Sequence, residues 1–167
     1  ESLENCMNKE DRTSFLPVTE ETNVFQGTLY AIPWNANVGL LYYRKDLLEK
    51  YNMRPPDTWE ELIELCTQIS ASESVYGYLW QGKQYEGLIC NFLEFIGSKN
   101  GGIIDSTGNI IIDSEHNTIV LDLMRDLIWQ YRVSPQNTYS ELEEESSRHL
   151  FQQGKGLFLR NWTYVWG

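Results

Sequence analysis

Residues 38–70, VGLLYYRKDLLEKYNMRPPDTWEELIELCTQIS, decide the predicted fold. They open with the near-continuous apolar run 38–44, which is typical of a strand covered on both faces. A short helix and the loop NMRPPD follow. Thr58 and Glu61 then form the T-x-x-E pattern of a capping box, which predicts the start of an amphipathic helix. Its apolar face is expected to carry Trp59, Leu62, Ile63, Cys66 and Ile69.

The same alternation of short apolar runs and amphipathic stretches continues along the chain. VYGYLW (75–80) and GLFLR (156–160) are predicted strands, and we expect them to share one mixed sheet with 38–44. Ser140 and Glu143 match a second capping box. The helices that flank the sheet are expected to begin near Thr58, Lys83, Ser114 and Ser140. This interleaving predicts an α/β fold.

Two further segments have weaker patterns. GTLYAIPW (27–34) is an apolar stretch with a proline near its end, and it is predicted as a strand at an edge or exit of a sheet. GIIDSTGNIIID (102–113) is predicted as a small hairpin around Asp105 to Asn109.

Composition and charge exclude several classes of protein. The chain has 167 residues, 41% of them hydrophobic and 22% charged, which is ordinary for a soluble globular domain. No apolar run approaches the roughly 20 residues of a membrane-spanning helix. Twenty-four acidic against 13 basic side chains give a net charge of −11, and no basic cluster is present. A nucleic-acid partner is therefore excluded, and a polyanionic ligand is disfavoured.

Catalytic and metal-binding patterns are weak throughout. Three cysteines and two histidines are scattered without ligand spacing, so we expect neither a metal site nor a cofactor. The sequence lacks the G-x-S-x-G, P-loop, G-x-G-x-x-G and H-E-x-x-H motifs. One run of carboxylates is interpreted as the solvated N-terminus of a helix, where acids favour the dipole; it comprises Glu141, Glu143, Glu144 and Glu145.

The aromatic content is the unusual feature, with six Trp, ten Tyr and six Phe residues. Several tryptophans lie at the ends of predicted strands beside planar amides. These groups are Trp34 with Asn35 and Asn37, Trp80 with Gln81 and Gln84, and Trp162 with Asn161. An aromatic face beside fixed donors and acceptors matches the two sides of a sugar ring. The alternative is that these tryptophans cover helix ends or fill a domain interface.

At this point the sequence resembles a known family. The stretch GTLYAIPWNANVGLLYYRKDLLEKYNMRPPDTWEEL (27–62) is similar to the extracellular sugar-binding receptors of ABC importers, the group of maltose- and trehalose/maltose-binding proteins. FQQGKGLFLRNWTYVW (151–166) matches the family's F-x-x-G-K and N-W-x-Y patterns. The central YGYLWQGKQYEGLICNFLEFIGSKNGG (76–102) resembles the trehalose/maltose branch in particular.

The resemblance implies a two-lobed receptor of the periplasmic-binding-protein type, which closes on its ligand by a hinge motion. Each lobe would be a three-layer αβα unit with a mixed sheet. Residues 1–37 would be the end of the first lobe with the strand that crosses the hinge, and residues 38–167 would be an incomplete second lobe. The chain opens without an initiator methionine or signal peptide and stops in an aromatic run, so we expect a fragment.

The N-W-x-Y match implies that Trp162 is a platform on which a sugar ring stacks and that Tyr164 is a second contact. Positions 35 and 37 carry Tyr and Asp in the trehalose/maltose branch, and both are Asn here, which changes the hydrogen-bonding groups offered to the ligand. In the QGKQY loop (81–85), Tyr85 is the stronger candidate and Gln84 the weaker. The full set of expected ligand-binding residues is Trp34, Asn35, Asn37, Trp80, Gln81, Gln84, Tyr85, Asn161, Trp162 and Tyr164.

The function implied by the resemblance is non-catalytic. The chain would bind a small carbohydrate, a mono- or oligosaccharide, and deliver it to the membrane permease subunits of an ABC transporter. Its location would be periplasmic or extracytoplasmic, with lipid anchoring left open. A glycoside hydrolase is one alternative, although it needs two carboxylates across the scissile bond and the expected site offers amides and aromatics. A sensory sugar-binding domain is another, which permease genes beside this one would argue against.

Overall fold

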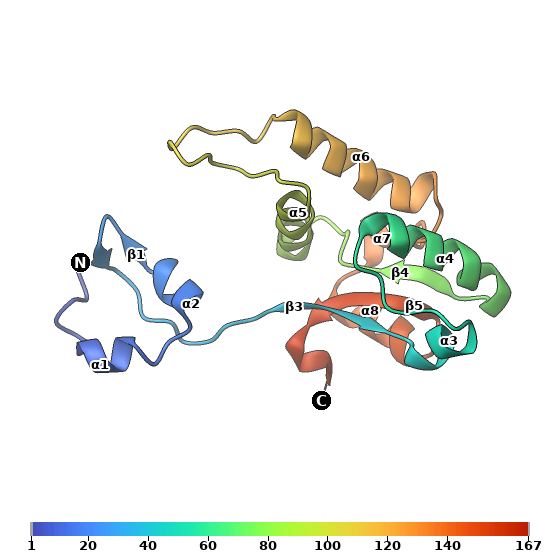
Figure 1. Cartoon of the computed structure of the whole chain (residues 1–167), viewed down its shortest axis with the longest axis horizontal. Helices are drawn as coiled ribbons and strands as arrows, with labels where there is room; N and C mark the ends of the chain where they lie inside the picture. Colours follow the sequence, from blue (N-terminus) through green and yellow to red (C-terminus); the bar gives the residue numbers. More distant parts are fainter. Residues whose placement is uncertain (1, 167) are drawn as a thin grey trace. The chain divides into compact units, whose positions relative to one another are not determined.

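The computed structural model describes residues 2–166, and the chain divides into two compact units, Glu1–Val38 and Gly39–Gly167 (Figure 1). The first unit is small. It holds the helices α1 (Lys9–Arg12) and α2 (Pro17–Glu21) and the antiparallel strands β1 (Val24–Phe25) and β2 (Thr28–Leu29). Gln26 and Gly27 both have positive φ, as a two-residue hairpin turn requires.

The strand predicted over 27–34 is wrong beyond Leu29. Residues 30–38 have no regular secondary structure. β2 pairs only with the two residues of β1 in the described part of the chain, and Pro33 has no backbone N–H to donate to a ladder. An apolar run without a partner strand does not stay a strand.

The second unit is built on one mixed sheet of three strands. These are β3 (Gly39–Tyr43), β4 (Tyr76–Leu79) and β5 (Gly156–Trp162), in the order β3–β5–β4. β3 runs antiparallel to β5, and β4 runs parallel to it. The prediction that the three runs share one sheet is confirmed.

Helices cover this sheet. They are α3 (Lys45–Lys50), α4 (Trp59–Glu73), α5 (Glu86–Ser98), α6 (Glu115–Trp129), α7 (Thr138–Glu141) and α8 (Glu144–Gln152), and a 3₁₀ helix, η1 (Thr163–Trp166), follows β5. Thr58 Oγ1 accepts from the Glu61 N–H at 3.1 Å, so α4 begins at the predicted cap. Ser114 caps α6 in the same way. α5 begins three residues after the predicted Lys83.

The cap predicted at Ser140 is wrong. Ser140 lies inside the short helix α7, and its hydroxyl donates to the Asn137 carbonyl. Leu142 follows in an extended conformation and is buried, which separates α7 from α8. The capping box of α8 is instead formed by Glu143 and Ser146. Burial of one leucine therefore outweighed the local capping pattern.

The sheet is the middle of three layers. Phe158 of β5 belongs to the larger core cluster with residues of α4, α5 and α6, and the next residue, Leu159, packs with Leu79 and Leu142 against α8. Successive strand residues point to opposite faces, so both faces of β5 are buried. Figure 1 shows α4 and α8 on opposite sides of the sheet.

The predicted hairpin at 102–113 is reduced to a single antiparallel bridge between Ile104 and Ile110. In the turn between them, the Asp105 carboxylate accepts hydrogen bonds from the backbone N–H groups of Thr107 and Asn109. Among the residues described, no helix combines the length and the apolar character needed to cross a membrane.

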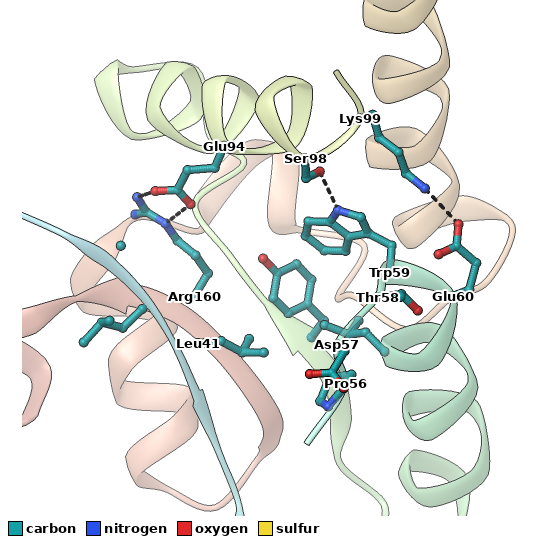
Figure 2. Close-up of a pocket in the computed structure, with 14 residues that line it drawn as sticks. Leu41, Pro56, Asp57, Thr58, Trp59, Glu60, Glu94, Ser98, Lys99 and Arg160 are labelled. Carbon is teal, nitrogen blue, oxygen red and sulfur yellow. Dashed lines mark hydrogen bonds and ion pairs between the residues drawn. The ribbon is translucent and has the colours of Figure 1, made fainter. Parts of the chain in front are cut away.

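Trp59 joins the helices to the core, and its removal is expected to destabilise the fold. Its ring stacks on Phe95 at 4.1 Å between centroids. Its Nε1 donates to Ser98 Oγ at 2.8 Å (Figure 2). Truncation of a fully buried aromatic residue to Ala costs about 3–5 kcal/mol. Because the Trp59 indole is only half-buried, we expect Trp59→Ala to lower the free energy of unfolding by about 2–3 kcal/mol. Urea unfolding of the full-length protein measures this.

Trp129 provides the control. In the sequence, Trp129 also falls on the apolar stripe of an amphipathic helix, the one that begins near Ser114, and this predicts a core residue. The prediction is wrong, since Trp129 is 48% exposed at the C-terminal end of α6. Trp129→Ala should therefore cost less than about 1 kcal/mol. Equal losses for the two variants would contradict the assignment of Trp59 to the core.

Candidate functional site

The candidate site lies at one edge of the sheet in the second unit. The parallel strands β4 and β5 both end there, and β3 begins there, because Gly39 stands opposite Trp162. Trp80 and Gln81 follow β4 directly, and Asn161 and Trp162 close β5. The carboxyl ends of parallel strands are where open α/β sheets form their ligand crevices.

Arg160 packs on one face of the Trp162 ring, and Glu144 binds its indole N–H. The guanidinium carbon of Arg160 lies 3.8 Å from the ring centre, a cation–π contact. The period-two alternation of a strand explains this, since residues 160 and 162 point to the same face. The indole Nε1 donates to Glu144 Oε1 at 3.1 Å. The half-buried ring is therefore fixed by two charged groups.

Arg160 carries a buried charge that has several partners. The residue is 4% exposed. Its guanidinium forms a two-pronged ion pair with Glu94 of α5, with Nε to Oε2 at 2.9 Å, and donates from Nη1 to Gln81 Oε1 at 3.0 Å. Figure 2 shows the Arg160–Glu94 pair. A guanidinium suits this place because its planar fork binds a carboxylate and stacks on an aromatic ring at once.

Buried amides form a layer beneath these groups. Gln81 donates to the Ser147 hydroxyl at 3.0 Å and to the Arg160 carbonyl at 2.9 Å. The Asn161 side chain donates to the Glu144 carbonyl at 3.0 Å, and its oxygen accepts from the backbone N–H of Trp162 at 2.8 Å. Both amides are fully buried. They therefore fix the backbone on which Trp162 stands.

The acidic first turn of α8 holds both loops of the site. Tyr85 Oη donates to Glu144 Oε2 at 2.7 Å, so one carboxylate binds Tyr85 and Trp162 together. Tyr164 Oη donates to Glu145 at 2.6 Å, and Lys83 forms an ion pair with Glu143. Glu143, Glu144 and Glu145 thus join the QGKQY loop (81–85) to the NWTY segment (161–164).

The prediction that this acidic run is a solvated helix N-terminus is confirmed for Glu145, which is exposed in the first turn of α8. It is wrong for Glu144, which is half-buried, and for Glu141, which ends α7. A run of acids at a helix start has the same sequence pattern whether its side chains face solvent or bind distant loops. The pattern therefore carries no information on which loops reach it. Arg160 and Glu94 were also missed as site residues. The available signal was the arginine itself, because a charge within the apolar strand GLFLR needs a buried partner.

The model of the family described as "Bacterial extracellular solute-binding protein" matches residues 9–167. The chain belongs to this family. A probable ABC transporter-binding protein of Deinococcus radiodurans is 39% identical over 157 residues, which are 90% of this chain and 37% of that protein.

Solved structures of solute-binding proteins have the same fold. Maltose-bound MalE3 of T. maritima superposes with a TM-score of 0.88 at 42% identity, covering 99% of this chain and 42% of that one. A mannitol-bound ABC transporter solute-binding protein of Agrobacterium vitis superposes with a TM-score of 0.74 at 26% identity, covering 99% and 40%. The chain therefore spans about two fifths of the length of the relatives it matches.

The structure brings part of the predicted site together. Tyr85, Asn161 and Trp162 meet at Glu144, and Gln81 lies beneath them. Trp80 is buried, and its Nε1 donates to Ser134 Oγ at 3.1 Å. Two candidates are exposed at the rim, Gln84 and Tyr164.

Three predicted residues belong to the first unit. Trp34, Asn35 and Asn37 are all exposed there, Trp34 at 98%. That they meet Trp162 and contact a ligand stays a prediction, as does direct ligand contact by the other candidates.

Protonation at the site follows from its hydrogen bonds. Burial opposes ionisation of Glu144, but hydrogen bonds from Tyr85 and Trp162 outweigh it and hold the pKa of Glu144 below its ordinary value of 4.5. Burial and the hydrogen bond to Glu144 raise the pKa of Tyr85. Burial and Glu145 raise the pKa of Tyr164 to about 12. At neutral pH the site therefore presents an ionised carboxylate and two neutral phenols.

We expect the Arg160–Glu94 pair to be strongly coupled. Glu94→Gln leaves the buried guanidinium without its counter-charge, and breaking such a pair costs about 3–5 kcal/mol when both groups are buried. Because the Glu94 side chain is 43% exposed, about 2–3 kcal/mol is expected, with a coupling of about 1–3 kcal/mol in a cycle with Arg160→Met. Urea unfolding measures each corner. The exposed pair Arg125–Asp122 is the control, at under about 1 kcal/mol, and additive losses at Arg160 and Glu94 would contradict the coupling.

The lowered pKa of Glu144 makes part of the stability depend on pH. Its contribution is fully present above the unfolded pKa near 4.5 and is lost as pH falls through the lower folded pKa. The difference in free energy of unfolding between wild type and Glu144→Gln should therefore be constant from pH 7 to about pH 5 and shrink below that. Urea titrations at each pH test it, and a difference that grows towards low pH would contradict the assignment.

Proposed function

We propose that this chain is part of the substrate-binding component of an ABC-type sugar importer. It would bind a small carbohydrate, a mono- or oligosaccharide, in a cleft between two lobes and deliver it to membrane permease subunits. Residues 38–167 would supply most of the second lobe, and residues 1–37 the end of the first lobe and the hinge crossing.

The observation that carries the proposal is the fixed indole of Trp162. A sugar presents a flat C–H face and a rim of hydroxyls. Trp162 offers a half-buried aromatic face that Arg160 and Glu144 hold still. The hydroxyl of Tyr85 binds the same carboxylate of Glu144, and that of Tyr164 binds the neighbouring Glu145. Such an arrangement binds a neutral ring through contact area and orients it through hydrogen bonds.

Relatives support the chemical class of the ligand. The T. maritima relative at 42% identity is described as maltose-bound, and the A. vitis relative at 26% as mannitol-bound. Both ligands are neutral polyhydroxy compounds. The match to a probable ABC transporter-binding protein supports the permease as partner.

We propose that the site is not catalytic. A glycoside hydrolase needs one carboxylic acid that is protonated near neutral pH. Glu144 is held ionised by two hydrogen bonds, and Glu94 is engaged by the guanidinium of Arg160. Neither carboxylate is therefore suited to donate a proton to a leaving group. No cofactor is needed for this role.

We also propose an extracytoplasmic location. The family name places such receptors outside the cell, and a sugar receptor that feeds an importer works on the outer side of the cytoplasmic membrane. Whether a lipid anchor holds this protein there is open, and labelling of the expressed full-length protein with a radioactive fatty acid would test it.

Calorimetric titration of the full-length protein with maltose, trehalose and mannitol tests the proposal. We expect at least one of the three to bind. Trp162→Ala should weaken that binding by about 30- to 1000-fold, or about 2–4 kcal/mol, because a buried aromatic anchor is lost. Trp162→Phe keeps a flat apolar face and should lose noticeably less.

Trp59→Ala is the control for folding. It should lower the melting temperature and leave the affinity of the folded fraction nearly unchanged, because Trp59 packs on Phe95 in the core. Equal affinities for wild type and Trp162→Ala would remove Trp162 from the site, and failure of all the sugars to bind would refute the proposed ligand class.

A further inference from the structure

We propose that Glu144 is the positioning residue of the site, whose carboxylate locks the side chains of Trp162 and Tyr85 into one pre-organised surface. This deepens the proposed function and rests on it for the identity of the ligand. Trp162 ends β5 and Tyr85 precedes α5, so the two aromatic residues belong to segments far apart in the chain. Glu144, at the start of α8, is the residue that both of them bind.

The geometry assigns one carboxylate oxygen to each aromatic residue. Oε1 accepts from the indole N–H of Trp162 at 3.1 Å, and Oε2 accepts from the hydroxyl of Tyr85 at 2.7 Å. Hydrogen bonds to an ionised acceptor are about twice as strong as neutral ones. Each bond removes rotation about the side-chain torsions of one ring, so a ligand that stacks on the site need not order the rings itself.

The backbone of Glu144 is anchored independently of its side chain. Its carbonyl accepts from the buried amide of Asn161 at 3.0 Å and from the hydroxyl of Ser147 at 3.0 Å. α8 itself packs on β5, the strand that carries Trp162. The carboxylate therefore starts from a fixed point, which a positioning group requires.

The neighbouring acids do not share this role. Glu143 pairs with Lys83 and caps α8, and Glu145 binds Arg148 and the rim residue Tyr164. Glu141 is exposed and accepts from Asn137 at 2.8 Å. Glu143, Glu144 and Glu145 lie at the start of α8 and favour its dipole, so a purely electrostatic role for Glu144 would be shared by its two neighbours. Glu141 ends the preceding helix, α7.

Two substitutions separate hydrogen bonding from charge. Glu144→Gln keeps the length of the side chain: its oxygen can accept from the indole, and its amide can donate to the Tyr85 hydroxyl, which is able to accept. Glu144→Leu keeps similar bulk and loses both bonds. Glu141→Leu is the matched control, since it removes a carboxylate from the same region without touching either aromatic residue.

The first readout needs no ligand. In the full-length protein labelled with ¹⁵N-tryptophan, the indole N–H signal of Trp162 is assigned by its loss in Trp162→Phe. We expect its exchange with solvent to be slow in the wild type, in Glu144→Gln and in Glu141→Leu, and to be at least about tenfold faster in Glu144→Leu. Unchanged exchange in Glu144→Leu would overturn the proposal, whether or not any sugar binds.

The second readout is the affinity for maltose, measured by calorimetry on the folded fraction. Glu144→Leu should bind about 5- to 100-fold more weakly, the cost of ordering two free side chains, and Glu144→Gln should stay within about threefold of the wild type. If Gln and Leu lose affinity equally while the indole signal of the Gln variant is unchanged, the carboxylate contacts the ligand itself and the positioning role is wrong. Failure of the wild type to bind maltose, trehalose or mannitol would count against the proposed function alone, since the indole exchange still decides the role of Glu144.

Discussion

A buried positive charge is the constraint on which the site depends. Arg160 sits in the central strand of the sheet and is 4% exposed. Such a group is tolerated only with an anionic partner and further hydrogen-bond acceptors. Glu94 and Gln81 supply these from α5 and from the end of β4, and the remaining flat face of the guanidinium lies on Trp162. The contacts that satisfy the Arg160 charge therefore join β5 to α5 and to the end of β4, and they fix the ring of Trp162.

The acidic turn of α8 extends this arrangement to the rim. Glu144 takes the indole N–H of Trp162 and the hydroxyl of Tyr85, and its neighbours hold Lys83 and Tyr164. The rings of Trp162 and Tyr85 are therefore held from both helical layers. Arg160 acts from the side of α5, and Glu144 acts from the side of α8. Charges used in this way serve the protein's own geometry, and under the proposed function they leave the second face of the Trp162 ring to the ligand.

Much of the architecture was predictable because it follows from local physical chemistry. The period of apolar residues identified the strands 38–44, 75–80 and 156–160, and hydroxyl caps at Thr58 and Ser114 set the starts of two helices. The strand expected beyond Leu29 and the cap expected at Ser140 failed for a common reason. In each case a tertiary effect outweighed the local preference. The apolar run beyond Leu29 has no partner strand among the described residues, and burial of Leu142 separates α7, which contains Ser140, from α8.

The sequence by itself determined the α/β class, the family and the prominence of Trp162, Tyr85 and Asn161, because these depend on residue types at short spacings. Only the tertiary structure decided which charges hold them. Glu144 was indistinguishable from the other acids of its run, and nothing local tied Arg160 to Glu94. Those pairings join segments from 18 to 66 residues apart. They exist because the packing of α5 and α8 on opposite faces of one sheet brings the partners within hydrogen-bond distance, which no periodicity along the chain encodes.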